Sequence, residues 1–279
     1  MKSLGAGKPL SFPLQGTVAL HESAKFTESE SPNIAGVLRG SDPQLKDQYV
    51  IFSAHVDHVG IGDPVNGDAI YNGAVDNASG TAALLEIARA FAENSERPKR
   101  SVLFLAVAGE EEGLLGSDFY ARHPTVPVSQ IAANINMDGI SLFYDFRDIV
   151  ALGSDHNSMI HQVQDVAKHM HLEVSPDPMP EENFFIRSDQ YSFVKQGVPA
   201  LTISEGFKTV DPSLDGRKIS IAWEQTRYHQ PSDDMNQPLD FAARKCTQVL
   251  LAVGYEVSQS AERPAWNPGD VFEQRFGRH

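Results

Sequence analysis

Two histidines and an aspartate follow directly after an apolar segment of the chain. Residues 49–54 are rich in apolar and β-branched residues and predict a strand, and His55, Asp57 and His58 come immediately after it. Ligands of open α/β sheets collect at the carboxyl ends of strands. If the chain stays extended here, the Asp57 carboxylate can hold the imidazole of His55 and raise its basicity toward a metal. A hydrogen-bonded structural histidine explains this cluster alone equally well.

Carboxylates recur at comparable places in three further segments. Asp76 follows a polar, glycine-containing turn, where alone it would be interpreted as a helix-capping residue. Glu110 and Glu111 follow the apolar run 101–108, and Asp138 follows the run 131–137. Because adjacent side chains at a strand end point in different directions, one acid of such a pair can bind a metal while its neighbour faces the substrate as a general base.

His229, with the adjacent phenol of Tyr228, is the last candidate, although the following Pro-Ser-Asp is also ordinary turn chemistry. Together the candidates are two imidazoles and three carboxylates: His55, Asp76, Glu111, Asp138 and His229. Three carboxylates and one bridging hydroxide carry four negative charges, which balance two divalent ions. The mixed nitrogen and oxygen set suits zinc, with manganese or cobalt as alternatives. The sequence therefore favours a two-metal site.

Strands and helices must alternate to hold these residues, which predicts an α/β fold. Residues 205–227 lack a clear period, so we expect an irregular loop that contributes to a substrate pocket. Residues 33–38 and 49–54, separated by turn residues 40–43, are expected to form paired strands. The other expected strands are 101–108, 131–137 and 200–203, and the expected helices are 79–94, 157–170 and 240–257.

Composition and motifs exclude several other classes of protein. A net charge of −14 without a Lys or Arg cluster argues against a nucleic-acid partner. No apolar run approaches the ~20 residues of a membrane span, so we expect no membrane partner. The single cysteine, Cys246, excludes an intramolecular disulfide framework and lies at a predicted core position. No H-E-x-x-H helix, G-x-S-x-G elbow or phosphate-binding loop is present, and four histidines are predicted to be surface residues: His156, His161, His169 and His171.

From about residue 33 to 234 the chain resembles the co-catalytic zinc aminopeptidase family, which also contains glutamate carboxypeptidase and glutaminyl cyclase. Six motifs carry the resemblance in the family's order: A-H-V-D-H-V-G, N-G-A-V-D-N-A-S-G, G-E-E-E-G-L-L-G-S, N-M-D, R-S-D-Q-Y-S-F and Y-H-Q-P-S-D. The resemblance implies a three-layer α/β/α fold of the zinc-dependent exopeptidase type, with a central mixed, largely parallel sheet. It also implies substrates that are peptides with a free N-terminus.

The resemblance further implies a role for each site residue. His55 and Asp138 would bind one metal, Glu111 and His229 the other, and Asp76 would bridge both. Glu110 would be the general base, Asp57 the partner of His55, and Tyr228 a donor to the developing oxyanion. From the residues themselves, Arg187 and Asp189 are expected to contact the substrate. Arg187 could hold a carboxylate, but beside Asp189 it is expected to be paired and to shape the pocket. Relatives also hold the peptide bond after the bridging aspartate in the cis form, so we expect a cis bond between Asp76 and Asn77.

Three alternative functions stay open. A catalytically inactive binding module should have lost ligands, which this chain keeps. Glutaminyl cyclases of this family have a Trp-His pair at the position where this chain has Tyr228-His229. Glutamate carboxypeptidases have Gly-Ser-Asp at the position where this chain has Arg187-Ser188-Asp189. They also need a basic pocket for the terminal carboxylate of the substrate. The arginine-containing form is seen in aminopeptidases, so aminopeptidase activity is favoured.

We expect an N-terminal segment at residues 1–32 and a peptidase domain at 33–279. Many exported relatives carry a signal peptide and a protease-associated domain, and the residues before His55 leave no room for either, so the chain is expected to be a fragment or a minimal form. The resemblance implies an exported protein, yet residues 1–4 lack the apolar segment of a secretory signal. The aromatic residues of the polar tail, Trp266, Phe272 and Phe276, are expected to pin it to the body.

Overall fold

The computed structural model describes residues 15–25, 27–140, 142–237 and 242–277. The chain divides into two units, Met1–Glu30 and Ser31–His279. The described residues of the first unit are exposed and contain no helix or strand. Every element named below belongs to the second unit. Within the described ranges, each helix is too short or too polar to cross a membrane.

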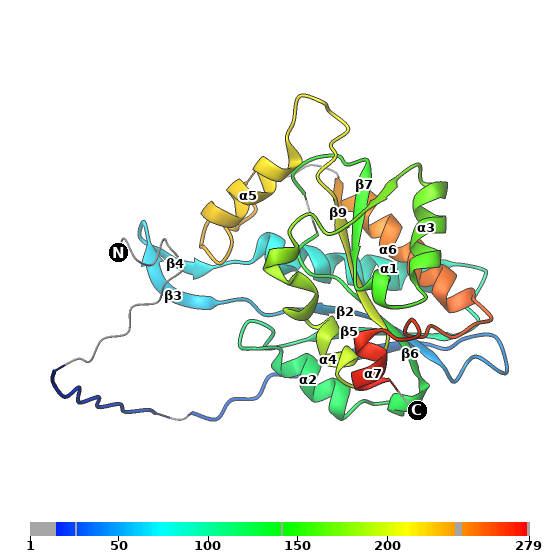
Figure 1. The fold of residues 1–279 in the computed structure, drawn as a ribbon, viewed down its shortest axis with the longest axis horizontal. Coiled ribbons are helices and arrows are strands. Elements are labelled where there is room, and N and C mark those ends of the chain that lie inside the picture. Colours follow the sequence, from blue (N-terminus) through cyan, green and yellow to red (C-terminus); the bar gives the residue numbers. More distant parts are fainter. Residues whose placement is uncertain (1–14, 26, 141, 238–241, 278–279) are drawn as a thin grey trace. The chain divides into compact units, whose positions relative to one another are not determined.

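A seven-stranded sheet forms the centre of the second unit (Figure 1). Four neighbouring strands run parallel, whereas the edge strand β1 is antiparallel to β5, and β7 is antiparallel to β9. The expected mixed, largely parallel sheet is thus confirmed. The strand order is β1 (Ile34–Leu38), β5 (Ser101–Val107), β2 (Tyr49–His55), β6 (Ile131–Asn136), β9 (Ala200–Glu205), β7 (Asp148–Leu152) and β8 (Glu173–Ser175).

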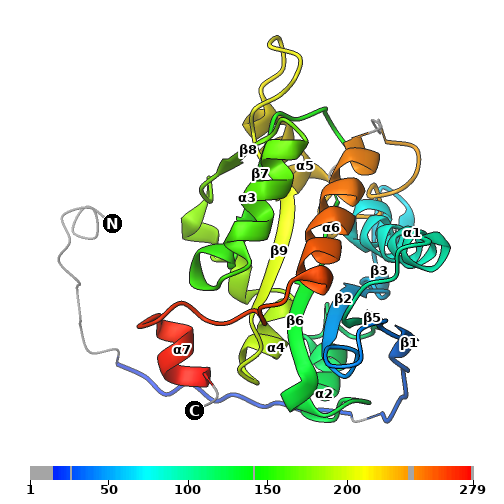
Figure 2. The ribbon, with the colours of Figure 1, turned by 90° about the vertical axis from the view of Figure 1, so that its right-hand side faces the viewer.

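Helices cover both faces of this sheet, which gives three layers. Along β2 successive side chains enter opposite cores, because side chains alternate across a strand: Phe52 lies in one core and Ile51 in the other. The first core is closed by α1 (Gly80–Glu93), α3 (Ile160–His169) and α6 (Ala242–Gln259), which lie on the face seen in Figure 2. The second is closed by α2 (Leu115–Arg122) and α4 (Gln190–Val194). Cys246 is buried in the first core, as predicted.

The predicted pairing of strands 33–38 and 49–54 is wrong, because β5 lies between β1 and β2. Burial explains the order: every residue of β2 is buried, so it occupies an inner position, whereas the mostly exposed β1 takes the edge. The expected loop over residues 205–227 is also partly wrong, since it contains α5 (Gly216–Thr226). Asp215 caps this helix by accepting a hydrogen bond from the Lys218 N–H, and most of the helix is exposed, which leaves little apolar periodicity to detect.

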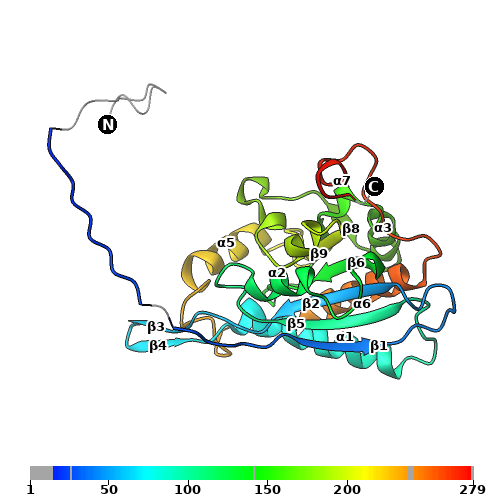
Figure 3. The same ribbon diagram turned by 90° about the horizontal axis from the view of Figure 1, so that it is seen from below.

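Two other segments add detail that the periodicity did not predict. The glycine-rich stretch after β2 contains a hairpin of β3 (Gly60–Val65) and β4 (Asp68–Tyr71), which projects from one end of the sheet (Figure 3). In the tail, α7 (Val271–Phe276) follows Trp266. Trp266, Phe272 and Phe276 pack with Val194, Ala200 and Phe185, so the predicted attachment of the tail is confirmed.

Candidate metal centre

Three neighbouring parallel strands bring four of the candidate residues to one edge of the sheet. His55 is the last residue of β2, Glu110 and Glu111 follow β5, and Asp138 follows β6. In register, His55 lies opposite Val107 of β5, and Ser53 lies opposite Asn136 of β6. Because parallel strands end at the same edge, residues more than 80 positions apart in the chain become neighbours.

Asp76 reaches the same place from the segment Ala74–Ser79, which leads into α1. Buried Asp233 accepts hydrogen bonds from the backbone N–H groups of Val75 and Asp76, at 3.0 and 3.1 Å, and the Asn77 side chain donates to the Met137 carbonyl at 2.9 Å. The peptide bond between Asp76 and Asn77 is cis, as predicted. These contacts hold the nearly buried Asp76 carboxylate between two groups of side chains.

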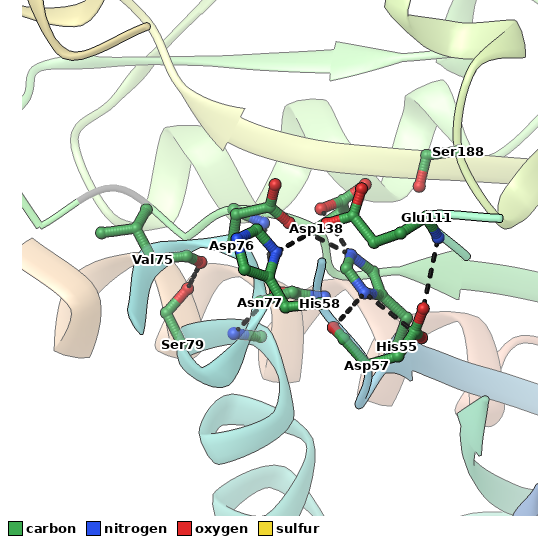
Figure 4. Close-up of polar contacts among 12 residues, drawn as sticks. His55, Asp57, His58, Val75, Asp76, Asn77, Ser79, Glu111, Asp138 and Ser188 are labelled. Carbon is green, nitrogen blue, oxygen red and sulfur yellow. Dashed lines mark hydrogen bonds and ion pairs between the residues drawn. The ribbon is translucent and has the colours of Figure 1, made fainter. Parts of the chain in front are cut away.

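The first group consists of His55, Asp76 and Asp138 (Figure 4). His55 Nε2 lies 3.2 Å from Asp138 Oδ1 and 3.3 Å from Asp76 Oδ1. His55 is fully buried. Burial alone would lower the pKa of His55, but Asp138 and Asp76 outweigh this effect and raise it to about 12. The group therefore has an excess of negative charge that favours a cation.

The second group consists of His58, Asp76, Glu111 and His229. His229 Nε2 lies 2.9 Å from Glu111 Oε2 and 3.2 Å from Asp76 Oδ2. His58 Nδ1 lies 2.7 Å from the other oxygen of Glu111. Asp76 thus turns one oxygen toward each group, the arrangement that a carboxylate bridging two ions requires.

The donor atoms of the two groups are of the types that zinc binds in proteins. His229 Nε2 is buried and has no hydrogen bond of acceptable geometry, although two carboxylate oxygens lie within 3.2 Å. Ligand atoms around a tetrahedral zinc, each about 2.0–2.2 Å from the ion, lie roughly 3.3–3.6 Å apart. The spacings from His55 Nε2 and His229 Nε2 to the nearby carboxylate oxygens are 2.9 to 3.3 Å, at or slightly below the short end of that range.

Glu110 and Tyr228 lie on the wall of a cavity of about 420 Å³ that also reaches Asp76 and Asp138. Burial and the Asp138 carboxylate raise the pKa of Glu110 to about 8, against the lowering effect of His55. A carboxylate with its pKa near neutrality is suited to take up and return a proton. Tyr228 stacks on His229 with ring centroids 3.9 Å apart, and burial, followed by Asp76, raises the pKa of its phenol, which keeps it a proton donor.

Asp57 supports the centre in two ways. Its carboxylate lies 3.7 Å from His55 Nδ1, which is longer than a hydrogen bond, while its backbone carbonyl lies 3.2 Å from the same nitrogen. Its other carboxylate oxygen accepts the Glu111 N–H at 3.2 Å. Asp57 therefore links the backbone segments that carry His55 and Glu111.

The expected pairing of Arg187 with Asp189 is wrong. Arg187 lines the cavity and pairs with Glu182 at 3.4 Å, with its guanidinium 5.4 Å from the ring centroid of Phe184. Asp189 is fully buried just before α4, beside Ser117 rather than on the cavity wall, so its position does not support direct contact with substrate. Burial, despite the lowering effect of Ser117, raises its pKa to about 7, and its charge adds to the negative surroundings of Glu110.

Two residues of this centre were given no role from the sequence. His58 was visible in the H-V-D-H cluster, but only the fold brings it to Glu111. Asp233 was interpreted as turn chemistry, whereas it also accepts a hydrogen bond from the Gln237 amide at 2.6 Å and holds the Asp76 segment. The four histidines predicted to lie at the surface do not belong to either group, and His156 pairs with Asp270 at 2.7 Å near α7.

A mixed sheet between two helical layers, with imidazoles and carboxylates gathered at the carboxyl ends of its strands, is the architecture of a metal-dependent α/β hydrolase. The model of peptidase family M28 matches residues 33–254. The chain belongs to this family. The resemblance recognised from the six motifs is therefore confirmed.

Curated relatives include peptidases from fungi. The chain is similar to a "probable zinc metalloprotease" of Pyrenophora tritici-repentis, with 39% identity over 38% of this chain and 23% of the relative. It is also similar to a "probable leucine aminopeptidase 2" of Aspergillus oryzae, with 26% identity over 78% of this chain and 43% of the relative. The chain thus spans less than half the length of these two relatives.

Solved structures share the fold at low sequence identity. A zinc aminopeptidase from Bacillus subtilis superimposes with a TM-score of 0.60 and 22% identity, over 82% of this chain and 50% of the other. A glutaminyl cyclase from Porphyromonas gingivalis superimposes with a TM-score of 0.51 and 20% identity, over 81% of this chain and 75% of the other. The fold is therefore shared by enzymes of more than one activity.

Proposed function

We propose that this protein is a two-metal aminopeptidase that removes residues one at a time from the N-terminus of peptides. The observation that carries the proposal is the position of Asp76, whose two oxygens lie 3.3 Å from His55 and 3.2 Å from His229. His55 and Asp138 are assigned to one ion, and Glu111 and His229 to the other. Zinc is the expected ion, with manganese or cobalt as alternatives.

Two bound ions would supply Lewis acidity and lower the pKa of a water held near them. Glu110 takes the proton of that water and later returns it to the leaving amine, a task that suits its raised pKa. Tyr228 donates a hydrogen bond to the oxyanion that forms on the scissile carbonyl. The loss of one such donor typically costs about 3–4 kcal/mol of barrier.

Carboxylates that are not assigned as metal ligands, such as Glu110 and Asp177 on the cavity wall, support the direction of attack. The α-ammonium group of a peptide is attracted to a carboxylate-rich site, which places the first peptide bond beside Glu110. A carboxypeptidase of the glutamate carboxypeptidase type needs a free cation for the terminal carboxylate. Among the described residues that line the cavity, Arg187 is the basic one, and Glu182 already engages it.

Glutaminyl cyclase activity is the second candidate, because one of the similar structures is such an enzyme. That reaction needs an N-terminal glutamine and releases ammonia instead of an amino acid. This chain has Tyr228 beside His229, whereas the cyclases have a Trp-His pair at this position. The tyrosine therefore favours hydrolysis.

The test compares aminoacyl anilides and short peptides with the zinc-loaded protein. Acetylation of the substrate's α-amine should lower kcat/KM by orders of magnitude, while amidation of its far carboxylate should matter little. The opposite ranking would identify a carboxypeptidase. Release of ammonia from glutaminyl peptides without hydrolysis would identify a cyclase.

A further inference from the structure

Trp223 lies on the cavity wall beside Tyr228. It belongs to α5, and its ring centroid is 6.0 Å from that of Tyr228, which stacks in turn on His229. The backbone carbonyl of Trp223 accepts the Tyr228 N–H at 3.3 Å. One residue of α5 therefore supports Tyr228 both through its ring and through its backbone.

The indole N–H of Trp223 meets a buried amide, that of Gln237. Gln237 is only 5% exposed, and its Oε1 accepts the indole N–H at 2.9 Å. Its Nε2 donates to Asp233 Oδ1 at 2.6 Å and to the Asp234 carbonyl at 2.9 Å. The Gln237 amide thus links the cavity wall to the fully buried carboxylate of Asp233.

Only one orientation of this amide satisfies both neighbours. A side-chain amide has an oxygen that accepts and an NH2 group that donates, whereas an indole N–H only donates and a carboxylate only accepts. Rotation of the amide by 180° would place donor against donor at Trp223 and oxygen against oxygen at Asp233. Because the site is buried, such a mismatch is unfavourable, so each neighbour fixes the amide for the other.

Asp233 carries this constraint to the metal centre. Its carboxylate accepts the N–H groups of Val75 and Asp76 at 3.0 and 3.1 Å, and its backbone carbonyl accepts the Ala74 N–H at 3.0 Å. These hydrogen bonds hold the segment from which the Asp76 carboxylate turns one oxygen toward each group of ligands. A buried carboxylate depends on its donors, so the loss of the Gln237 donor would weaken the hold of Asp233 on this segment.

We propose that Gln237 is a positioning residue that holds the bridging carboxylate of Asp76, through Asp233, in a fixed place relative to the cavity wall at Trp223. This inference rests on the proposed function, because that function assigns Asp76 as the bridge between two ions. Gln237 belongs neither to the two groups of ligands nor to the cavity lining, so it acts through its neighbours. Since Asp76 faces both groups, the loss of Gln237 weakens the binding of both ions.

The experiment measures zinc affinity by calorimetric titration of the metal-free protein. Gln237→Met keeps the length of the side chain and removes its hydrogen bonds, and we expect it to lower the affinity for both ions about tenfold, a usual effect of losing a residue that supports a ligand. Trp223→Phe keeps an aromatic face on the cavity wall and removes only the N–H donor, so it should lower the affinity severalfold. Gln225→Met, at an exposed glutamine of α5, is the matched control and should leave the affinity unchanged.

A double-mutant cycle separates positioning from general destabilisation. Because both residues act through the same hydrogen bonds, the variant that combines Trp223→Phe with Gln237→Met should lose no more zinc affinity than Gln237→Met alone. Additive losses, unchanged affinity in Gln237→Met, or weakening of only one of two bound ions overturns the positioning role. If Gln237→Met does not fold, Trp223→Phe decides: a severalfold loss of zinc affinity supports the role, and an unchanged affinity overturns it.

The zinc titrations also separate this role from the proposed function. If Gln237→Met weakens both ions in a protein that cleaves no aminoacyl anilide, the positioning role stands and the aminopeptidase function fails. If the unmodified protein binds a single ion and Gln237→Met weakens it, the role stands and the two-metal centre fails. Cleavage of anilides together with normal zinc affinity in Gln237→Met overturns the role alone, and absence of zinc binding overturns both.

Discussion

His58 Nδ1 and Glu111 Oε1 lie 2.7 Å apart, and the two side chains are only 6% and 8% exposed. This contact involves one carboxylate oxygen of Glu111, and the other oxygen faces His229. Gly73 packs so closely on this histidine that a Cβ there would lie 2.6 Å from its ring. His58 thus holds the carboxylate of Glu111 in one orientation.

Replacement of His58 should therefore weaken the binding of one metal ion and leave the binding of the other unchanged. We expect His58→Ala to lower the affinity for an ion at Glu111 and His229 by about 10–100-fold, the usual effect of losing a residue that orients a ligand. Zinc titration by calorimetry measures both sites. His161→Ala, an exposed histidine on α3, is the control. Equal weakening of both sites would contradict an orienting role.

Removal of the metal should abolish activity, because three carboxylates gather at the centre and divalent cations neutralise their charge. A chelator should inactivate the enzyme and zinc should restore it. Metal analysis should find two ions per chain. Full activity with fewer than about one bound ion would contradict the two-metal centre.

Substitutions of the neighbouring acids Glu110 and Glu111 should cause different defects, because Glu110 is assigned as a base and Glu111 as a metal ligand. Glu110→Gln should keep both metals and lose most of kcat. Glu111→Gln should weaken zinc binding at one site, which titration of the purified variant with zinc measures. The reverse pattern would exchange the two assignments.

Asp233 should act on the centre through the backbone of the Asp76 segment. Asp233→Ala leaves the N–H groups of Val75 and Asp76 without their acceptor, which should cost about 1–3 kcal/mol for each buried group left unpaired. The temperature of thermal unfolding and the affinity for zinc should both decrease in this variant. Asp234→Asn, whose carboxylate accepts hydrogen bonds from neighbouring Asn236, should change neither. A stable Asp233→Ala variant with normal zinc affinity would show that other contacts hold the segment.

The sequence by itself determined the α/β class and where the chemical groups stand along the chain. Apolar runs that end in His55, Glu110 and Asp138 marked buried strands and their carboxyl ends, because local periodicity records which faces of an element are covered. The order of six motifs added the family and the cis bond after Asp76, both of which are confirmed. The role of each residue at the centre stays a prediction.

Tertiary structure decided which of these segments meet. The position of β5 between β1 and β2, the contact of His58 with Glu111, and the pairing of Arg187 with Glu182 instead of Asp189 all depend on how the chain packs in three dimensions. Periodicity carries no information about a partner elsewhere in the chain or about which of two nearby charges becomes buried. Asp189 shows the reason most clearly, because its sequence motif places it beside Arg187 while packing against Ser117 removes it from the cavity.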